Sequence, residues 1–231
     1  MASGTGEVDG KYYEVARSGT FAERLMAAAR RRMYRDFVRL AAVGEGETIL
    51  DIGVSDVMAE GANMLEVSDP HPGRITAVGL GEGAGFQATF PAIRYVRIEP
   101  HAPLPFGDKA FDIATSNAVL EHAGGDAAQH AMISEMCRVA RRVFLTVPHR
   151  FFPVEHHTGL PFLHWSDVTF GPACRLAGRA RWADPRELIL MSRGRLRALV
   201  PAGWRARIGT TGLALGPFSS NLYLALDPLS R

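Results

Sequence analysis

The sequence predicts an α/β fold in which a mostly parallel sheet is covered by helices on both faces. Short apolar runs of strand length alternate with longer amphipathic runs, and this alternation is typical of strand–helix–strand units. Apolar residues make up 47% of the 231 residues and charged residues 22%, as in globular proteins with a sizeable core. At about 150 residues per domain, the length fits one large domain.

The composition excludes several classes of protein. The formal net charge is +2, from 26 basic and 24 acidic residues, whereas nucleic-acid binders usually carry a strong basic excess, so we expect no nucleic-acid partner. No apolar run reaches the ~18 residues of a transmembrane helix, and the first residues lack the apolar core of a secretory signal. Two cysteines, Cys137 and Cys174, are too few for a disulfide framework. We therefore expect a reducing, cytoplasmic location.

The elements are expected in the following order. Residues 1–20 form a flexible polar tail, and residues 21–231 form the domain. Residues 21–43 form an amphipathic helix, because apolar side chains recur every three or four positions. Buried strands are expected at 48–53, 74–80, 93–98, 111–117 and 143–148, with helices at 57–67, 126–140 and 185–203 and final strands at 204–209 and 221–226.

The helix at 21–43 carries a dense group of arginines, which includes Arg30, Arg31, Arg32, Arg35 and Arg39. One interpretation is a helix face exposed to solvent. The other is contact with an anionic partner, such as a phosphate or a membrane headgroup. The sequence leaves both interpretations open.

A ligand site is expected where the first strand ends. In open parallel sheets, ligands bind beyond the carboxyl ends of the strands, and here Asp51, Gly53 and Ser55 stand at that place. A glycine lets the backbone approach a ligand closely, and the next helix offers free N–H groups. The alternative is an ordinary strand end with a turn glycine. The full G-x-G-x-x-G pattern is absent, which counts against a dinucleotide dehydrogenase.

Four segments in a fixed order indicate a family. These are ETILDIG, ITAVG, LPFGDKAFDIATSNAVLEH and RRVFLTVPHRFFPVE, within residues 44–150. In order and spacing the sequence resembles class I S-adenosylmethionine-dependent methyltransferases of the methyltransferase type 11 kind. The resemblance implies a three-layer Rossmann-like methyltransferase fold, with a seven-stranded, mostly parallel sheet whose last strand is antiparallel. It also implies that the cofactor lies across the ends of strands one to four.

The glycine loop departs from the family pattern. Relatives carry D-x-G-x-G-x-G after strand one, whereas this chain has D-I-G-V-S-D-V, in which only Gly53 is kept. The valines, Val54 and Val57, bring side chains to where the methionine part of the cofactor passes. The resemblance assigns Asp51 and Gly53 to the cofactor, and the Ser55 hydroxyl offers it a hydrogen bond.

The other cofactor positions are also altered. Relatives carry an acid after strand two that holds the ribose, but Gly79 stands there and Glu82 follows three residues later. A lost charge-assisted hydrogen bond costs about 1.5–3 kcal/mol. Glu99 is the acid nearest the position that binds adenine in relatives. Asn117, at the end of strand four, binds the cofactor or caps a turn.

Methyl transfer from a sulfonium is an in-line displacement that depends mainly on proximity and orientation, worth about 7–11 kcal/mol. An oxygen or nitrogen acceptor also needs a base. The candidates are His149, and His157 with its tautomer fixed by Glu155. They lie in residues 149–183, which we interpret as an inserted lid or substrate segment. Its aromatic residues either wall an apolar or sugar-stacking pocket or pack the insertion onto the sheet: Phe151, Phe152, Phe162 and Trp165.

The resemblance also places Glu121 and His122 near cofactor and substrate, in a structural, positioning or catalytic role. No metal site is predicted, because the histidines lack the HExxH pattern. The predicted function is methyl transfer from S-adenosylmethionine to a small-molecule or saccharide-type acceptor. The alternative is a catalytically inactive binding or accessory protein with the same fold, because the glycine loop is poor and the acid after strand two is missing.

Overall fold

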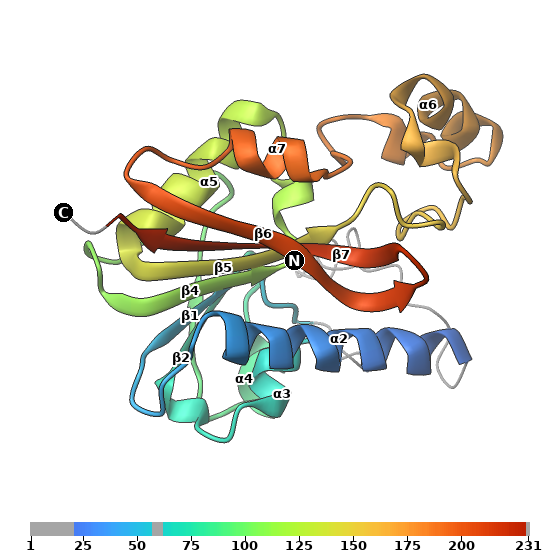
Figure 1. The fold of residues 1–231 in the computed structure, drawn as a ribbon. Coiled ribbons are helices and arrows are strands. Elements are labelled where there is room, and N and C mark those ends of the chain that lie inside the picture. The colour runs from blue at the N-terminus through green and yellow to red at the C-terminus, as the bar shows by residue number, and fades with distance from the viewer. Residues whose placement is uncertain (1–20, 57–61, 230–231) are drawn as a thin grey trace, which may run out of the picture.

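The computed structural model describes residues 21–56 and 62–229. The predicted tail at 1–20, and residues 57–61 of the predicted helix at 57–67, lie outside this part. Seven strands form one sheet in the order β3-β2-β1-β4-β5-β7-β6 (Figure 1). The strands are β1 (Ile49–Ile52), β2 (Ile75–Gly79), β3 (Arg94–Arg97), β4 (Phe111–Asn117), β5 (Ala140–Pro148), β6 (Trp204–Leu215) and β7 (Phe218–Pro228).

Strands β1 to β5 pair in parallel, and β7 pairs antiparallel with both β5 and β6. The predicted seven-stranded, mostly parallel sheet with an antiparallel last strand is therefore confirmed. Five of its strands start within a few residues of where the apolar runs place them. The last two are longer than predicted and form one hairpin.

Helices cover both faces of the sheet (Figure 1). One face carries α5 (Asp126–Val139) and α7 (Arg193–Ala198), whose buried residues join one core cluster with the strands. The other face carries α2 (Phe21–Leu40), α3 (Met64–Ser68) and α4 (Ala84–Thr89), whose residues join a second cluster. The three predicted layers are therefore present. No helix in the described ranges combines the length and apolarity needed to cross a bilayer.

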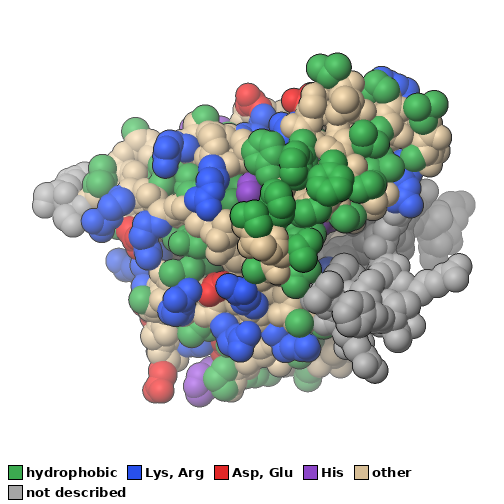
Figure 2. Space-filling model, turned by 45° about the vertical axis from the view of Figure 1, so that its right-hand side comes forward, with side chains coloured by type: hydrophobic (Ala, Val, Ile, Leu, Met, Phe, Trp, Pro, Cys, Tyr) green, Lys and Arg blue, Asp and Glu red, His purple; other side chains and the backbone are tan. Residues whose placement is uncertain are grey.

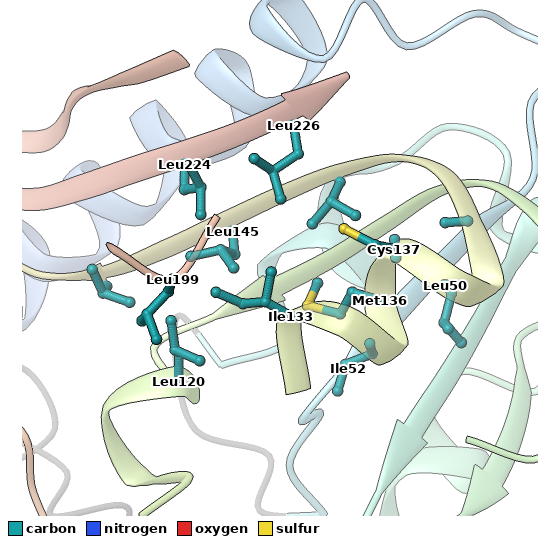
Figure 3. Close-up of a cluster of buried hydrophobic side chains, with 14 of the residues drawn as sticks. Leu50, Ile52, Leu120, Ile133, Met136, Cys137, Leu145, Leu199, Leu224 and Leu226 are labelled. Carbon is teal, nitrogen blue, oxygen red and sulfur yellow. The ribbon is translucent and has the colours of Figure 1, made fainter. Parts of the chain in front are cut away.

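Figure 3 shows the first core, in which Ile133 and Met136 of α5 lie against the apolar side chains of the sheet. Ile133, Met136 and Leu145 are fully buried. Burying one such side chain contributes about 1.5–3 kcal/mol. Cys137 lies in the same cluster, and both cysteines are buried and free.

Helix α2 is anchored to both the sheet and the hairpin. The rings of Phe37 and Phe144 lie 5.5 Å apart. The Thr211 hydroxyl donates to Asp36 at 2.7 Å, and an Arg207 N–H donates to the Leu40 carbonyl at 2.9 Å. These contacts hold the helix along the sheet face on which the cavity described below opens.

The predicted helix at 185–203 is mostly wrong, because only α7 is helical there. Residues 188–191 run extended between two cores. Leu188 and Leu190 pack in a cluster of the insertion, whereas Ile189 and Met191 pack in the main core. This alternation has the period of a strand, which is why the segment does not coil.

The insertion at 149–183 packs largely on itself. It contains the short helices η3 (Leu163–Trp165) and η4 (Ala180–Ala183) and the helix α6 (Asp167–Leu176). Its own small core contains Phe170, Cys174 and Trp182. In Figure 1, α6 stands apart from the three layers. A role as lid or substrate segment stays a prediction.

Candidate active site

A cavity opens at the carboxyl ends of β1, β4 and β5, under α2 and α3. Its wall comes from all five elements: Arg30, Met33, Tyr34, Phe37, Asp51, Gly53, Val54, Asn63, Met64, Leu65, Thr115, Ser116, Asn117, Phe144 and Thr146. The cavity volume is about 70 Å³, below the roughly 300–1,000 Å³ of small-molecule sites. Entry of a nucleoside therefore requires α2 or the loop after β1 to move.

Gly53 lies in this wall with a φ of +92°, a value that favours glycine. A Cβ at this position would overlap the side chain of Val119, in the turn after β4. The amides of Gly53 and Val54 both donate to the Val78 carbonyl, at 2.8 and 3.2 Å. The absent side chain thus makes room for Val119. Direct contact between Gly53 and the cofactor stays a proposal.

Hydrogen bonds to other segments hold the loop after β1. The Asn63 amide accepts from the Ser55 N–H at 3.0 Å and donates to the Ser55 carbonyl at 2.9 Å. The Asp56 carboxylate accepts from the backbone amides of Gly83 and Phe86, at 3.2 and 2.8 Å. Ser55 is fully buried. Val57 lies outside the described residues.

Two carboxyl groups meet at the base of the cavity. Burial raises the pKa of Asp51 to about 6. Burial, and then the charge of Asp51, raises the pKa of Glu66 of α3 well above its ordinary value. Both Glu66 oxygens are buried and lack a hydrogen-bond partner of good geometry among the described residues. Because two buried carboxylates repel each other, a cationic group would be favoured beside them.

The cavity wall also contains a positive charge and neutral polar groups. Arg30 of α2 is half-buried and lines the cavity, whereas Arg31, Arg32 and Arg35 are exposed. The Thr146 hydroxyl donates to the Asn117 amide oxygen at 2.6 Å, which leaves the amide NH₂ group as the donor that Asn117 can offer. The cavity wall therefore contains an acidic group, a basic group and an amide.

The other predicted cofactor residues lie away from this cavity. A Cβ at Gly79 would lie 2.9 Å from the Tyr95 hydroxyl and from a backbone oxygen. Glu82 forms an ion pair with Arg97 of β3, and Glu99 approaches the same guanidinium at 3.8 Å. Both acids are exposed. Of the predicted residues, the structure therefore brings together Asp51, Gly53 and Asn117 in the cavity wall.

A second group of polar side chains joins the turn after β4 to the insertion. The Nε2 atoms of His122 and His157 lie 3.1 Å apart. The Nδ1 atom of His157 lies 2.9 Å from a Glu155 oxygen, which is the pairing that the sequence predicts. Glu121 lies beside them, with an oxygen 4.0 Å from the His122 Nε2 atom.

Burial sets the charges of this group. It raises the pKa of Glu121 to about 7. Burial, and then the charge of His157, lowers the pKa of His122 to about 4. Burial also opposes the ionisation of Glu155, but hydrogen bonds from His157 and Thr158 outweigh it and lower the pKa of Glu155 to about 2. Glu155 is therefore ionised, and it fixes the orientation of the His157 ring.

His149 lies apart from Glu155 and His157. It lines a separate cavity of about 510 Å³ with Arg150, Phe151, Trp165 and Arg193 among its neighbours. Its Nδ1 atom lies 3.2 Å from the Ser219 carbonyl oxygen. Figure 2 shows hydrophobic side chains gathered on the face that carries the insertion. Of the four predicted aromatic residues, Phe151 and Trp165 line this cavity, Phe162 is exposed and Phe152 is buried.

The sequence analysis does not identify Glu66 as a residue beside the cavity or Arg30 as part of its wall. The one available signal for Glu66 is a lone acid between apolar neighbours in MLEVS. The LPF motif has a structural explanation. Arg138 of α5 donates to the carbonyls of Leu104 and Phe106, and Glu135 accepts from the Leu104 N–H.

Residues 40–143 match the family model of a methyltransferase domain. The predicted resemblance to class I methyltransferases is confirmed. The matched range runs from the end of α2 into β5 and so contains most of the strands that form the cavity. No curated protein matches the sequence.

Solved structures of methyltransferases have a similar fold. A methyltransferase from Aquifex aeolicus is 13% identical with a TM-score of 0.52, over 87% of this chain and 92% of that one. A methyltransferase from Methanosarcina mazei is 17% identical with a TM-score of 0.55, over 84% and 98%. The magnesium protoporphyrin IX methyltransferase of Synechocystis PCC 6803, with bound SAH, is 16% identical with a TM-score of 0.57, over 96% and 92%.

Proposed function

We propose that the protein transfers a methyl group from S-adenosylmethionine to a small-molecule acceptor. The observation that carries the proposal is the cavity of Arg30, Asp51 and Asn117, which opens at the carboxyl ends of the strands within a methyltransferase domain. In sheets of this kind that edge is the ligand-binding edge. The similar structures from Aquifex aeolicus and Methanosarcina mazei are of S-adenosylmethionine-dependent enzymes.

The residues present fit this cofactor. Bound S-adenosylmethionine supplies an activated methyl group on a cationic sulfur, at the end of an amino-acid chain. The paired carboxyl groups of Asp51 and Glu66 would hold its ammonium group, and the Arg30 guanidinium would hold its carboxylate. Asn117 would donate a hydrogen bond from its amide. A cation beside the two carboxyl groups also offsets the cost of burying their charges, which is the main cause of both raised pKa values.

The remaining cofactor residues extend this site toward β2 and β3. Gly53 and Ser55 would contact the cofactor through the backbone of the loop after β1. Gly79, Glu82 and Glu99 would face the nucleoside, as the resemblance implies. For that role, Glu82 and Glu99 must turn away from Arg97, with which they now pair.

The acceptor side would be the insertion and the turn after β4. His157, whose ring is held by Glu155, is the side chain best placed to accept the acceptor's proton when no metal ion is bound. His149 would serve acceptor binding in its own cavity. There Phe151 and Trp165 offer apolar ring faces, which suit a saccharide-type acceptor. The contact of Arg31, Arg32 and Arg35 with an anionic surface stays a prediction.

Calorimetric titration with S-adenosylmethionine tests the cofactor site. We expect saturable heat, and we expect Asp51→Asn to weaken binding tenfold to a hundredfold, the effect of losing about 1.5–3 kcal/mol. Asp184→Asn is the matched control, because Asp184 lies outside the cavity and pairs only with nearby Arg186 among the contacts described. Absence of heat at millimolar cofactor contradicts the proposal.

A transfer assay tests the reaction itself. The protein is incubated with methyl-labelled cofactor and a panel of saccharide, phenol and amine acceptors, and label in the product is counted. Binding of cofactor without transfer to any acceptor would favour the inactive binding or accessory protein. The narrow cavity is the observation that makes this second outcome worth measuring.

A further inference from the structure

Three donor groups converge beside the cofactor cavity. They are the Glu121 carboxylate and the imidazoles of His122 and His157, and their ligand atoms all lie within 4.8 Å of one another. Glu121 and His122 belong to η2 (Leu120–His122), directly after β4, and His157 comes from the insertion. Two segments far apart in the sequence therefore build one small polar centre.

The hydrogen bonds of the two rings fix which nitrogen carries the proton. The His122 Nδ1 atom lies 2.7 Å from the Glu187 carbonyl oxygen, which can only accept. The His157 Nδ1 atom lies 2.9 Å from a Glu155 carboxylate oxygen, to which it can donate. In each neutral ring the Nδ1 atom therefore carries the hydrogen, and the Nε2 atom keeps its lone pair.

When both rings are neutral, their Nε2 lone pairs face each other across 3.1 Å. Next to them, both Glu121 oxygens are buried and have no hydrogen-bond partner among the described residues, and the residue is 1% exposed. A buried carboxylate is costly unless it is paired, hydrogen-bonded or bound to a metal. A cation held between the Glu121 carboxylate and the two Nε2 atoms would offset this cost.

We propose that Glu121, His122 and His157 bind a divalent transition-metal ion, with Zn²⁺ as the best match. Two imidazole nitrogens and one carboxylate oxygen are the ligands of many catalytic zinc sites, which keep a fourth position open. At Zn–N distances of about 2.0–2.1 Å, two nitrogens of a tetrahedral site lie about 3.3 Å apart, close to the distance seen here. The Glu121 oxygen, 4.0 Å from the His122 Nε2 atom, needs only a small shift.

The Nδ1 atoms of both histidines also make the contacts that are typical of metal-bound imidazoles. Metal-bound histidines usually donate their second N–H to a carboxylate or a backbone carbonyl. His157 does the first, toward Glu155, and His122 does the second, toward Glu187. The Trp182 ring lies 4.8 Å from the His157 ring and is buried, which keeps one side of the centre apolar.

The centre would serve the acceptor, a role that rests on the proposed function, whereas metal binding does not. Val119, which packs on Gly53 in the cavity wall, lies three residues before His122. A hydroxyl bound at the open position would lose its proton more readily, because a divalent ion lowers the pKa of a bound oxygen. With the ion bound, His157 acts through the metal rather than as the proton acceptor.

Metal binding is measured on the full chain without cofactor. The protein is stripped with a chelator and dialysed, and it is then titrated with Zn²⁺ by calorimetry and with Co²⁺ by visible absorption. We expect one ion per chain and the absorption of tetrahedral Co²⁺. His157→Gln and Glu121→Gln are each expected to weaken binding at least a hundredfold, and the control His130→Gln, on the exposed side of α5, is expected to change nothing. Circular dichroism verifies that every variant is folded.

The alternative is a proton shared between the two Nε2 atoms, with His157 as the cation. In that case the wild-type protein binds no stoichiometric ion, or the folded variants bind as much as the wild type, and either result overturns the proposal. The readout is independent of methyl transfer. Failure of the cofactor titration would therefore overturn the proposed function and leave a measured metal site intact.

Discussion

The side chain of Val119 occupies the space that a Cβ on Gly53 would need. Gly53 ends the first strand, and Val119 follows the fourth strand in the turn that leads to Glu121 and His122. The contact therefore joins the two loops to which we assign the cofactor side and the acceptor side of the proposed site. A glycine that in sequence suggests an opening for a ligand is, in the structure, a point of close packing.

Gly53→Ala is expected to destabilise the protein. The backbone has a φ of +92° at this position, and a left-handed conformation costs a residue with a side chain about 1–2 kcal/mol. Overpacking against Val119 adds about 1–3 kcal/mol. We expect a loss of about 2–5 kcal/mol in the free energy of unfolding, measured by urea denaturation. Gly46→Ala is the control, because no atom lies within 4 Å of a Cβ there; an equal loss in both variants would contradict the packing argument.

The sheet could be predicted because its central strands are largely buried on both faces. Runs such as ITAVG in β2, where every residue is buried, are apolar throughout and are hard to mistake. Residues 188–191 are also apolar throughout, but they lie between two separate cores. The second core belongs to the insertion, whose path no local pattern predicts, so the sequence wrongly favours a helix for this segment.

The site could be predicted only where the contacting residues are close together in the sequence. Glu155 and His157 are two residues apart, so their pairing is a local contact. The contact of His157 with His122 spans 35 residues and depends on the fold of the insertion. For the same reason, the sequence does not predict the ion pair between Glu82 and Arg97, because it depends on the register between β2 and β3.

The carboxyl pair of Asp51 and Glu66 is expected to make stability fall as the pH rises. The pKa of both groups is raised in the folded state, to about 6 for Asp51, so the folded protein binds protons that the unfolded chain releases. Their contribution is complete below the unfolded pKa of about 4. The part from Asp51 is lost as the pH rises through about 6, and the part from Glu66 is lost as the pH rises through the raised pKa of that group. Glu66→Gln is expected to remove roughly 1–3 kcal/mol of this dependence. Urea denaturation at pH 5 and pH 8 measures it; a slope equal to that of the wild type would contradict the pairing.

Arg30→Gln is expected to weaken binding of the cofactor and its demethylated product by tenfold to a hundredfold. Arg30 lines the cavity together with Asp51, and a hydrogen bond to a charged group contributes about 1.5–3 kcal/mol. Arg35→Gln, on the exposed face of the same helix, is the control. Calorimetry with both ligands makes the measurement. Equal affinities for the two variants would show that the arginines of α2 form only a solvated face.

Glu155→Gln is expected to act through the tautomer of His157. The Glu155 carboxylate accepts from the His157 Nδ1 atom at 2.9 Å and from the Thr158 amide at 2.6 Å. In the variant the amide oxygen can keep the Thr158 hydrogen bond, which turns the NH₂ group toward the Nδ1 atom. The ring must then accept at Nδ1 and carry its proton on Nε2. The lone pair that serves as base or metal ligand is lost from the centre.

Methyl transfer by Glu155→Gln is therefore expected to slow by about 10²–10⁴-fold in kcat, the usual contribution of a positioned base. Zn²⁺ affinity is expected to fall by about 10–100-fold, as when an outer partner of a ligand is changed. Cofactor affinity should not change, because Glu155 is not part of the cavity wall. Glu45→Gln, on the surface, controls for the lost charge. An unchanged kcat and an unchanged Zn²⁺ affinity together would mean that Glu155 only holds the Thr158 turn, and that the centre beside β4 has no part in activating the acceptor.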